Sequence, residues 1–123
     1  MILTVCVKSQ TVIHLDTIGQ KINSPNNLVR ALAGDSLSNS FCIVIPKEVK
    51  AHKHVWHSEQ VYVLQGLGEM RLGDKSFRIQ KGDLIFIPKN TVHAVKSIGD
   101  TVLKVISIQS PRFDGSDRVM VNE

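Results

Sequence analysis

The segment AHKHVWHSEQ, residues 51–60, gathers more chemically active side chains than any other part of the chain. Three of the five histidines and one glutamate fall between His52 and Glu59. Side chains alternate between the two faces of a strand, so His52 and His54 share a face if residues 49–55 are extended. Glu59 would face away from both in an uninterrupted strand. It joins them only if the chain bends at residues 55–58 and Glu59 opens a new strand.

The pattern on both sides of this segment is typical of strands. Short runs rich in Val, Ile and Phe alternate with Gly, Asp, Asn and Pro, which predicts strands separated by turns. Gly73 and Asp74 predict a tight hairpin turn. Closely spaced strands of this kind predict an all-β fold, a small antiparallel β-barrel or jelly roll that leaves a cavity. The expected strands are residues 4–7, 11–16, 40–45, 59–65, 69–72, 75–80, 83–88, 93–97 and 101–109.

One segment is compatible with a helix, so at most one short helix is expected. In PNNLVRALA, residues 25–33, Pro25 suits the first helical position, Ser24 can cap the start and Gly34 can end it. A loop leading into a strand is the equal alternative, because so short a helix is marginal.

Length and composition indicate one domain. The 123 residues contain no repeat or linker, and 42% are hydrophobic, enough for a buried core. We expect a single domain over residues 1–123, with N-terminal strands in 1–45, a motif core in 46–97, and a C-terminal strand and tail in 101–123. Cys6 and Cys42 lie in apolar runs, where cysteines usually behave as small buried hydrophobes.

Charge and hydropathy exclude two classes of partner. No apolar run approaches the roughly 20 residues that cross a bilayer, so no membrane partner is expected. The N-terminal MILTVCV has no basic leader, and we interpret it as a strand of a cytoplasmic protein, not a signal peptide. The net charge of +4 is scattered and only six aromatics are present, so no nucleic-acid partner is expected.

His93 provides a fourth candidate metal ligand. It closes GDLIFIPKNTVH, residues 82–93, in which Pro88 and Asn90 predict a turn. Proline cannot donate to a ladder, so one strand ends there and His93 begins the next. Three imidazoles and one carboxylate that converge in a small barrel suit one divalent transition metal ion: Fe, Mn, Ni, Cu or Zn.

Both segments resemble the two motifs of the cupin family. PKEVKAHKHVWHSEQVYVLQG (46–66) is similar to G-x5-H-x-H-x4-E-x6-G, and GDLIFIPKNTVHAVKS (82–97) to G-x5-P-x-G-x2-H-x3-N. Pro46 and Asn90 replace glycines and Ser97 replaces asparagine, but Asn90 tolerates positive φ and can keep its turn. The ending SPRFDGSDRV also resembles the tail of small cupins, a similarity that says nothing about chemistry. The resemblance implies a cupin fold and the metal ligands His52, His54, Glu59 and His93.

Several other side chains carry weaker expectations. His57 falls on the expected bend, where exposure to solvent is the ordinary outcome. Trp56 suits a pocket mouth or a dimer contact. Arg71 and Arg78 either line the barrel and bind a carboxylate or phosphate, or lie solvated on a strand face.

Tyr62 and Leu64 would lie on the face opposite Glu59, outside the cavity. Two bulky groups there suggest a covered outer face, consistent with the homodimers that are common among cupins.

The resemblance implies a metal-dependent enzyme that acts on an oxygen-rich small molecule. The reaction classes it suggests are dioxygenation, decarboxylation, and sugar or uronate isomerisation. The alternative is a non-enzymatic cupin binding module for a carbohydrate or organic acid. No motif places a second carboxylate beside Glu59, so the chemistry would depend on the metal, in a dry cavity walled by Val61, Val63, Ile85 and Ile87 or their neighbours.

Overall fold

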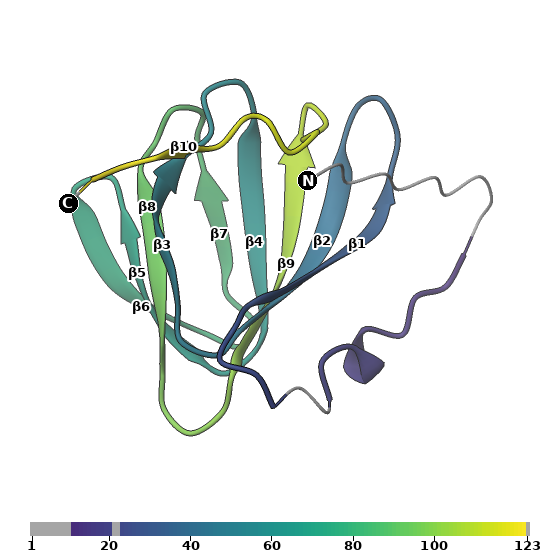
Figure 1. Cartoon of the computed structure of the whole chain (residues 1–123), viewed down its shortest axis with the longest axis vertical. Coiled ribbons are helices and arrows are strands. Elements are labelled where there is room, and N and C mark those ends of the chain that lie inside the picture. The colour runs from purple at the N-terminus through teal and green to yellow at the C-terminus, as the bar shows by residue number, and fades with distance from the viewer. Residues whose placement is uncertain (1–10, 21–22, 123) are drawn as a thin grey trace.

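Two five-stranded antiparallel sheets face each other in a sandwich (Figure 1). The computed structural model describes residues 11–20 and 23–122. Sheet A has the order β1-β2-β9-β4-β7, and sheet B has the order β10-β3-β8-β5-β6. The strands are β1 (Leu28–Gly34), β2 (Asn39–Ile45), β3 (Glu48–Lys53), β4 (Ser58–Gln65), β5 (Leu67–Leu72), β6 (Lys75–Gln80), β7 (Leu84–Ile87), β8 (His93–Ile98), β9 (Leu103–Ser110) and β10 (Val119–Met120). The expected all-β jelly-roll class is confirmed.

Most expected strands are present within two residues of their expected ends, and β6 has the expected limits. One expectation is wrong, and one pair of open alternatives is decided. Residues 11–16 contain no strand but lead into a 3-10 turn, η1 (Leu15–Thr17). Residues 25–33 form no helix, because β1 pairs with β2 from Leu28 opposite Val44 to Gly34 opposite Asn39. Sheet pairing outweighs the weak propensity of a short helix. The expected strand at residues 4–7, with Cys6, lies outside the described residues.

Apolar side chains from both sheets meet in one core between them. The turn at Gly66 carries the chain from β4 in sheet A to β5 in sheet B with a φ of +88°, and a Cβ there would lie 2.5 Å from the carbonyl oxygen of Val102. Only glycine fits that position. The buried members of the core are Ile45, Val61, Val63, Met70, Ile79, Ile85, Ile87, Leu103 and Val105.

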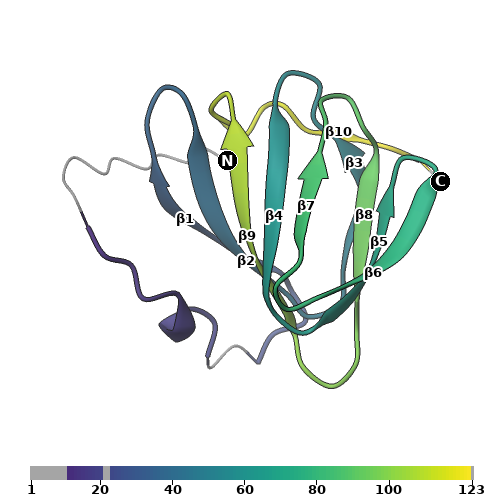
Figure 2. The ribbon, with the colours of Figure 1, turned by 180° about the vertical axis from the view of Figure 1, so that it is seen from behind.

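The two ends of the described chain pack differently on the sandwich. After β9 the C-terminal segment crosses one end of the sandwich and pairs with β3 as β10, with Met120 opposite His52 (Figure 1). The N-terminal segment lies on the β1 side (Figure 2), where the carbonyl of Leu15 accepts a hydrogen bond from Lys104 Nζ. Cys42 is fully buried and unpaired, as expected. In the described residues no helix has the length and apolarity needed to traverse a bilayer.

Candidate metal centre

A bend between β3 and β4 brings the histidines and the glutamate together from opposite sheets. β3 ends at Lys53 and β4 begins at Ser58, so His52 lies in sheet B and Glu59 in sheet A. The expected bend at residues 55–58 is therefore present. The register of β3 on β8 shifts between Val49 and His52, which is a bulge, and His52 then lies directly opposite His93.

The second histidine segment is held against the first by a backbone hydrogen bond. The N–H of Asn90 donates to the carbonyl of His54 at 2.6 Å. Asn90 has a φ of +58°, so asparagine does keep the turn that glycine usually makes. This bond fixes the turn before β8, and with it His93, beside the end of β3.

Four side chains converge on one point. The ligand atoms of His52, His54 and His93 all lie within 4.8 Å of one another. Glu59 Oε1 is 3.3 Å from Nε2 of His93 and 3.7 Å from Nε2 of His54. All four side chains are buried. Nitrogen and oxygen ligands lie about 2.0–2.2 Å from a zinc ion, so two ligands of one ion are at most about 4 Å apart. Small rotations of the imidazoles would bring all four ligand atoms within that distance of one another.

Each of the three imidazoles is oriented by its other ring nitrogen. Every Nδ1 faces a backbone carbonyl oxygen, to which it donates in the neutral ring. Nε2, with its lone pair, is then directed to the common point. Metal-binding histidines are oriented in the same way, by a partner that fixes the tautomer. The carbonyls belong to Lys50, Asp117 and Thr91, at 2.8, 2.5 and 2.9 Å from His52, His54 and His93 respectively.

A chain of hydrogen bonds holds the carboxylate of Glu59. Ser107 Oγ donates to Glu59 Oε2, and Gln109 Nε2 donates to Ser107 Oγ at 3.0 Å. Burial raises the pKa of Glu59, but the neighbouring His93 and the hydrogen bond from Ser107 outweigh it and lower the pKa to about 2. Glu59 is therefore an anion at neutral pH and supplies a negative ligand atom.

The donor set fits a divalent metal ion. Imidazole lone pairs at His54 and His93 face a carboxylate oxygen of Glu59 at close range, which is repulsive unless a proton or a cation lies between them. Nε2 of His93 is buried and has no hydrogen-bond partner in the part of the chain that the structure describes. Burial also lowers the pKa of His52 to about 4, with a smaller contribution from the charge on His93, and lowers the pKa of His54. Histidines held neutral in this way are ready to bind a metal.

The four residues belong to the lining of a largely apolar cavity of about 200 Å³. Such a volume is below the roughly 300–1,000 Å³ of pockets for drug-sized ligands, so a small metabolite fits better than a large cofactor. Val61 and Ile87 line it as expected, whereas Val63 and Ile85 are buried outside its lining. Of the two alternatives for Arg71 and Arg78, lining the cavity is excluded, because neither is among its lining residues.

The arginine in the cavity wall is Arg118, from the C-terminal segment. Local sequence carries no signal for it, because Arg118 reaches the cavity only through the pairing of β10 with β3.

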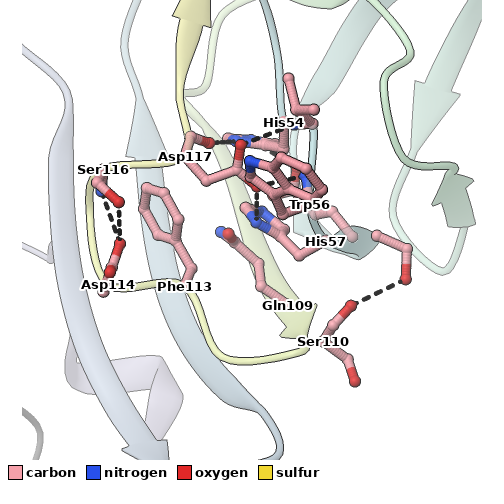
Figure 3. A network of polar contacts seen from close by, with 12 residues as sticks. His54, Trp56, His57, Gln109, Ser110, Phe113, Asp114, Ser116 and Asp117 are labelled. Carbon is pink, nitrogen blue, oxygen red and sulfur yellow. Dashed lines mark hydrogen bonds and ion pairs between the residues drawn. The ribbon is translucent and has the colours of Figure 1, made fainter.

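His57 is buried, which corrects the expectation that it is exposed. Only 2% of its surface is accessible, its ring stacks on His54 with centroids 4.2 Å apart, and Nδ1 lies 2.8 Å from Oδ2 of Asp117 (Figure 3). The bend curls back against the C-terminal segment, so a side chain on it can be covered. Trp56, next in the bend, is 74% exposed and does not line the cavity.

Asp117 joins the C-terminal segment to the bend. Its carboxylate accepts hydrogen bonds from the N–H groups of Val55 and Trp56 at 2.7 and 2.8 Å, and its carbonyl orients His54 (Figure 3). Burial raises the pKa of Asp117, but these two donors and His57 outweigh it and lower the pKa. One residue therefore caps the bend, pairs with His57 and orients a candidate ligand.

Asp117→Asn should destabilise the bend and weaken metal binding. The amide keeps the shape but directs an NH2 group at a hydrogen-bond donor, so we expect the free energy of unfolding to fall by about 1–3 kcal/mol. Metal affinity should fall by about tenfold, because His54 is less firmly oriented. Urea unfolding and metal titration would measure both. Asp114→Asn, in the same segment, is the matched control, because the carboxylate of Asp114 accepts its hydrogen bonds from the N–H and hydroxyl of Ser116. Equal behaviour of the two variants would contradict this role.

Comparison with known proteins agrees with the motifs. Residues 41–109 match the family model for the cupin domain, a segment that contains all four converging side chains. In solved structures, an uncharacterized conserved protein with a double-stranded β-helix domain from Klebsiella pneumoniae superposes with a TM-score of 0.79. The match covers 94% of this chain and 100% of that one at 15% identity, which reflects the fold alone.

Three curated relatives share parts of the sequence. An uncharacterized protein of Methanocaldococcus jannaschii is 38% identical over 66 residues, which is 54% of this chain and 53% of the relative. Mannose-1-phosphate guanylyltransferase RfbM of Salmonella typhimurium is 33% identical over 64% of this chain and 17% of its own length. Quercetin 2,3-dioxygenase of Bacillus subtilis is 26% identical over 63% of this chain and 25% of its own length. This chain thus matches about half or less of each of these relatives.

Proposed function

This chain belongs to the cupin family, and from that premise we propose that it is a metal-dependent enzyme acting on an oxygen-rich small molecule. The carrying observation is the set of three imidazoles whose Nε2 atoms converge with the Glu59 carboxylate in the lining of an apolar cavity. In this proposal His52, His54, Glu59 and His93 hold one divalent transition metal ion, of the group Fe, Mn, Ni, Zn and Cu.

The bound ion would act as a Lewis acid that polarises substrate oxygens. The chain's own residues supply the rest. Carbonyls behind the imidazoles keep the Nε2 lone pairs directed at the ion, and Ser107 holds Glu59 in place. The apolar walls exclude bulk water, which strengthens electrostatic interactions at the site.

The reaction classes we propose are dioxygenation, decarboxylation, and sugar or uronate isomerisation. The similarity to a quercetin dioxygenase supports the first of these. The alternative function is a non-enzymatic module that binds a carbohydrate or organic acid. It is favoured by the similarity to a mannose-1-phosphate guanylyltransferase, in which the matching part is only 17% of the enzyme.

Metal content and oxygen uptake test this proposal. The purified protein should contain close to one transition metal ion per chain by elemental analysis. Iron together with oxygen consumption in the presence of candidate substrates would favour a dioxygenase. Zinc, manganese or nickel without oxygen consumption would favour an isomerase or the binding module. No metal, even after reconstitution, would contradict the proposal.

We also propose a homodimer in the cytoplasm. Cys42 is unpaired, as is usual for thiols in reducing compartments.

The outer face of sheet A carries adjacent exposed apolar side chains, with Tyr62 opposite Leu84 and Gln60 between Phe86 and Ile108. Contiguous apolar surface of this kind marks interaction sites, and a second copy can cover it symmetrically.

Leu84→Lys should dissociate such a dimer, because it places a charge in an apolar contact. Leu84 is 61% exposed, so the fold of one subunit should tolerate the change. We expect at least about a tenfold weaker self-association, measured by sedimentation velocity. Leu37→Lys, at a leucine that is 73% exposed outside this face, is the control. A parent protein that is monomeric at micromolar concentration would contradict the dimer.

A further inference from the structure

The charge balance of the cavity favours an anionic ligand. Glu59 is the only acidic residue in the cavity lining among the described residues, and it is engaged in the candidate metal centre. A divalent ion held by one carboxylate and three neutral imidazoles keeps one net positive charge. Because the remaining walls are largely apolar, that charge is weakly screened and attracts an anion.

Arg118 adds a second positive charge at this cavity. β10 pairs Val119 with Lys53 and Met120 with His52 in antiparallel register. Continuing that register by one step places Arg118, the residue before Val119, opposite His54, the residue after Lys53. Its backbone N–H bonds to Ser116, but its guanidinium makes no hydrogen bond or ion pair with the described residues. A guanidinium free to donate at the wall of a cavity is suited to a carboxylate.

Gln109 offers the ligand a hydrogen-bond acceptor. Ser107 has a single hydroxyl proton, which it donates to Glu59, so it must accept from the amide nitrogen of Gln109. This fixes the orientation of the Gln109 amide. Its Oε1 is then a buried acceptor that has no hydrogen-bond partner among the described residues, on a residue that is 95% buried and lines the cavity. A ligand hydroxyl would satisfy that oxygen.

We propose that the substrate or ligand is a small hydroxylated organic anion, whose carboxylate is bound by Arg118 and whose hydroxyl donates to Gln109. This inference rests on the proposed metal centre and narrows its substrate class. It selects hydroxy acids, including sugar acids, over neutral sugars and apolar molecules. Arg118 and Gln109 are the residues that determine this specificity.

Three probes with the same three-carbon skeleton test whether the cavity selects a carboxylate and a hydroxyl group. Malonate carries two carboxylates, tartronate adds one hydroxyl group, and glycerol carries hydroxyls alone. Isothermal titration calorimetry on Zn²⁺-loaded protein would give their affinities, with zinc content measured before and after. In the parent protein we expect tartronate to bind about fivefold more tightly than malonate, and glycerol to bind far more weakly than either.

Substitutions then test which residue binds the carboxylate and which binds the hydroxyl group of the ligand. Arg118→Gln should weaken malonate and tartronate by about tenfold and leave zinc affinity unchanged. Gln109→Met should reduce the preference for tartronate over malonate to near unity. Arg78→Gln, which removes the same charge from an exposed position outside the cavity, should match the parent.

The outcomes separate this inference from the proposed function. A parent chain that holds no Zn²⁺ would overturn the metal centre and the inference with it. A chain that holds Zn²⁺ but binds tartronate equally well with and without Arg118 would overturn the inference alone. Glycerol that binds as tightly as malonate would also overturn the inference alone.

Discussion

Replacing His52 and His54 together by alanine should lower the affinity for a divalent transition metal by at least about a thousandfold. Four-ligand zinc sites bind with about 10–16 kcal/mol, so the loss of two ligands removes roughly half of that free energy. Nothing in the cavity replaces them, because the only other acidic or imidazole groups in its lining, within the described residues, are Glu59 and His93. The variant leaves a carboxylate and one imidazole, which make a weak site.

Two measurements check this loss. Metal titration gives the affinity, and thermal unfolding with excess metal gives the linked stabilisation. Metal at about a thousand times its dissociation constant should stabilise the parent by about 4 kcal/mol, which raises the melting temperature by about 10 °C or more. The double variant should show no such rise. His14→Ala, at an exposed histidine far from the site in sequence, is the control. A double variant that still binds metal like the parent would disprove the ligand assignment.

Acid should destabilise the metal-free protein, beginning well above the pKa values of ordinary carboxylates. Burial, and to a lesser degree the charge on His93, lower the pKa of His52 from 6.5 to about 4 in the folded protein. The unfolded chain therefore binds a proton that the folded chain excludes, and stability falls as the pH drops. From His52 alone the loss is about 3 kcal/mol between pH 7 and pH 4.

Other groups at the site act in the same direction. The pKa of His54 is also lowered, mainly by burial. Glu59 has its folded pKa lowered to about 2 from 4.5, so its contribution is present above pH 4.5 and is lost as the pH falls toward 2. The destabilisation should thus begin below about pH 6.5 and continue in a second stage below pH 4.5.

Urea unfolding of the chelator-treated protein at a series of pH values would measure this dependence. His52→Phe removes the titrating group, so its free energy of unfolding should vary less between pH 7 and pH 4 than that of the parent. His14→Ala should follow the parent curve. A parent protein equally stable at both pH values would contradict the assignment of His52 as a buried neutral histidine.

Some of the fold and site could be predicted because the signals are local. Alternation of side chains between faces is a property of any strand, so the apolar runs indicated β4 to β9 nearly to the residue. The alternation of side chains between the two faces of a strand required a bend before Glu59, on the condition that Glu59 joins His52 and His54. Asn90 could be assigned to its turn because few residues tolerate positive φ. These signals need only neighbouring residues in the chain.

Errors and open alternatives arose where a distant segment decides the outcome. Residues 25–33 have the start and end signals of a helix, which left a helix and a loop leading into a strand as equal alternatives, and the pairing of residues 28–34 with β2 decided for the strand. His57 lies on a bend, where side chains are normally exposed to solvent, but Asp117, sixty positions along the chain, covers it and pairs with its ring. Propensity is weak compared with such tertiary contacts.

The amino-acid sequence by itself determined the all-β class and the four side chains that could hold a metal, since both depend on residue type and spacing. Only the tertiary structure decided what surrounds them. It placed the carbonyls behind each imidazole, brought Arg118 to the cavity through β10, and left the oxygen of Gln109 without a partner. The physical reason is that strand pairing and burial join residues from separate parts of the chain, and no local pattern records those contacts.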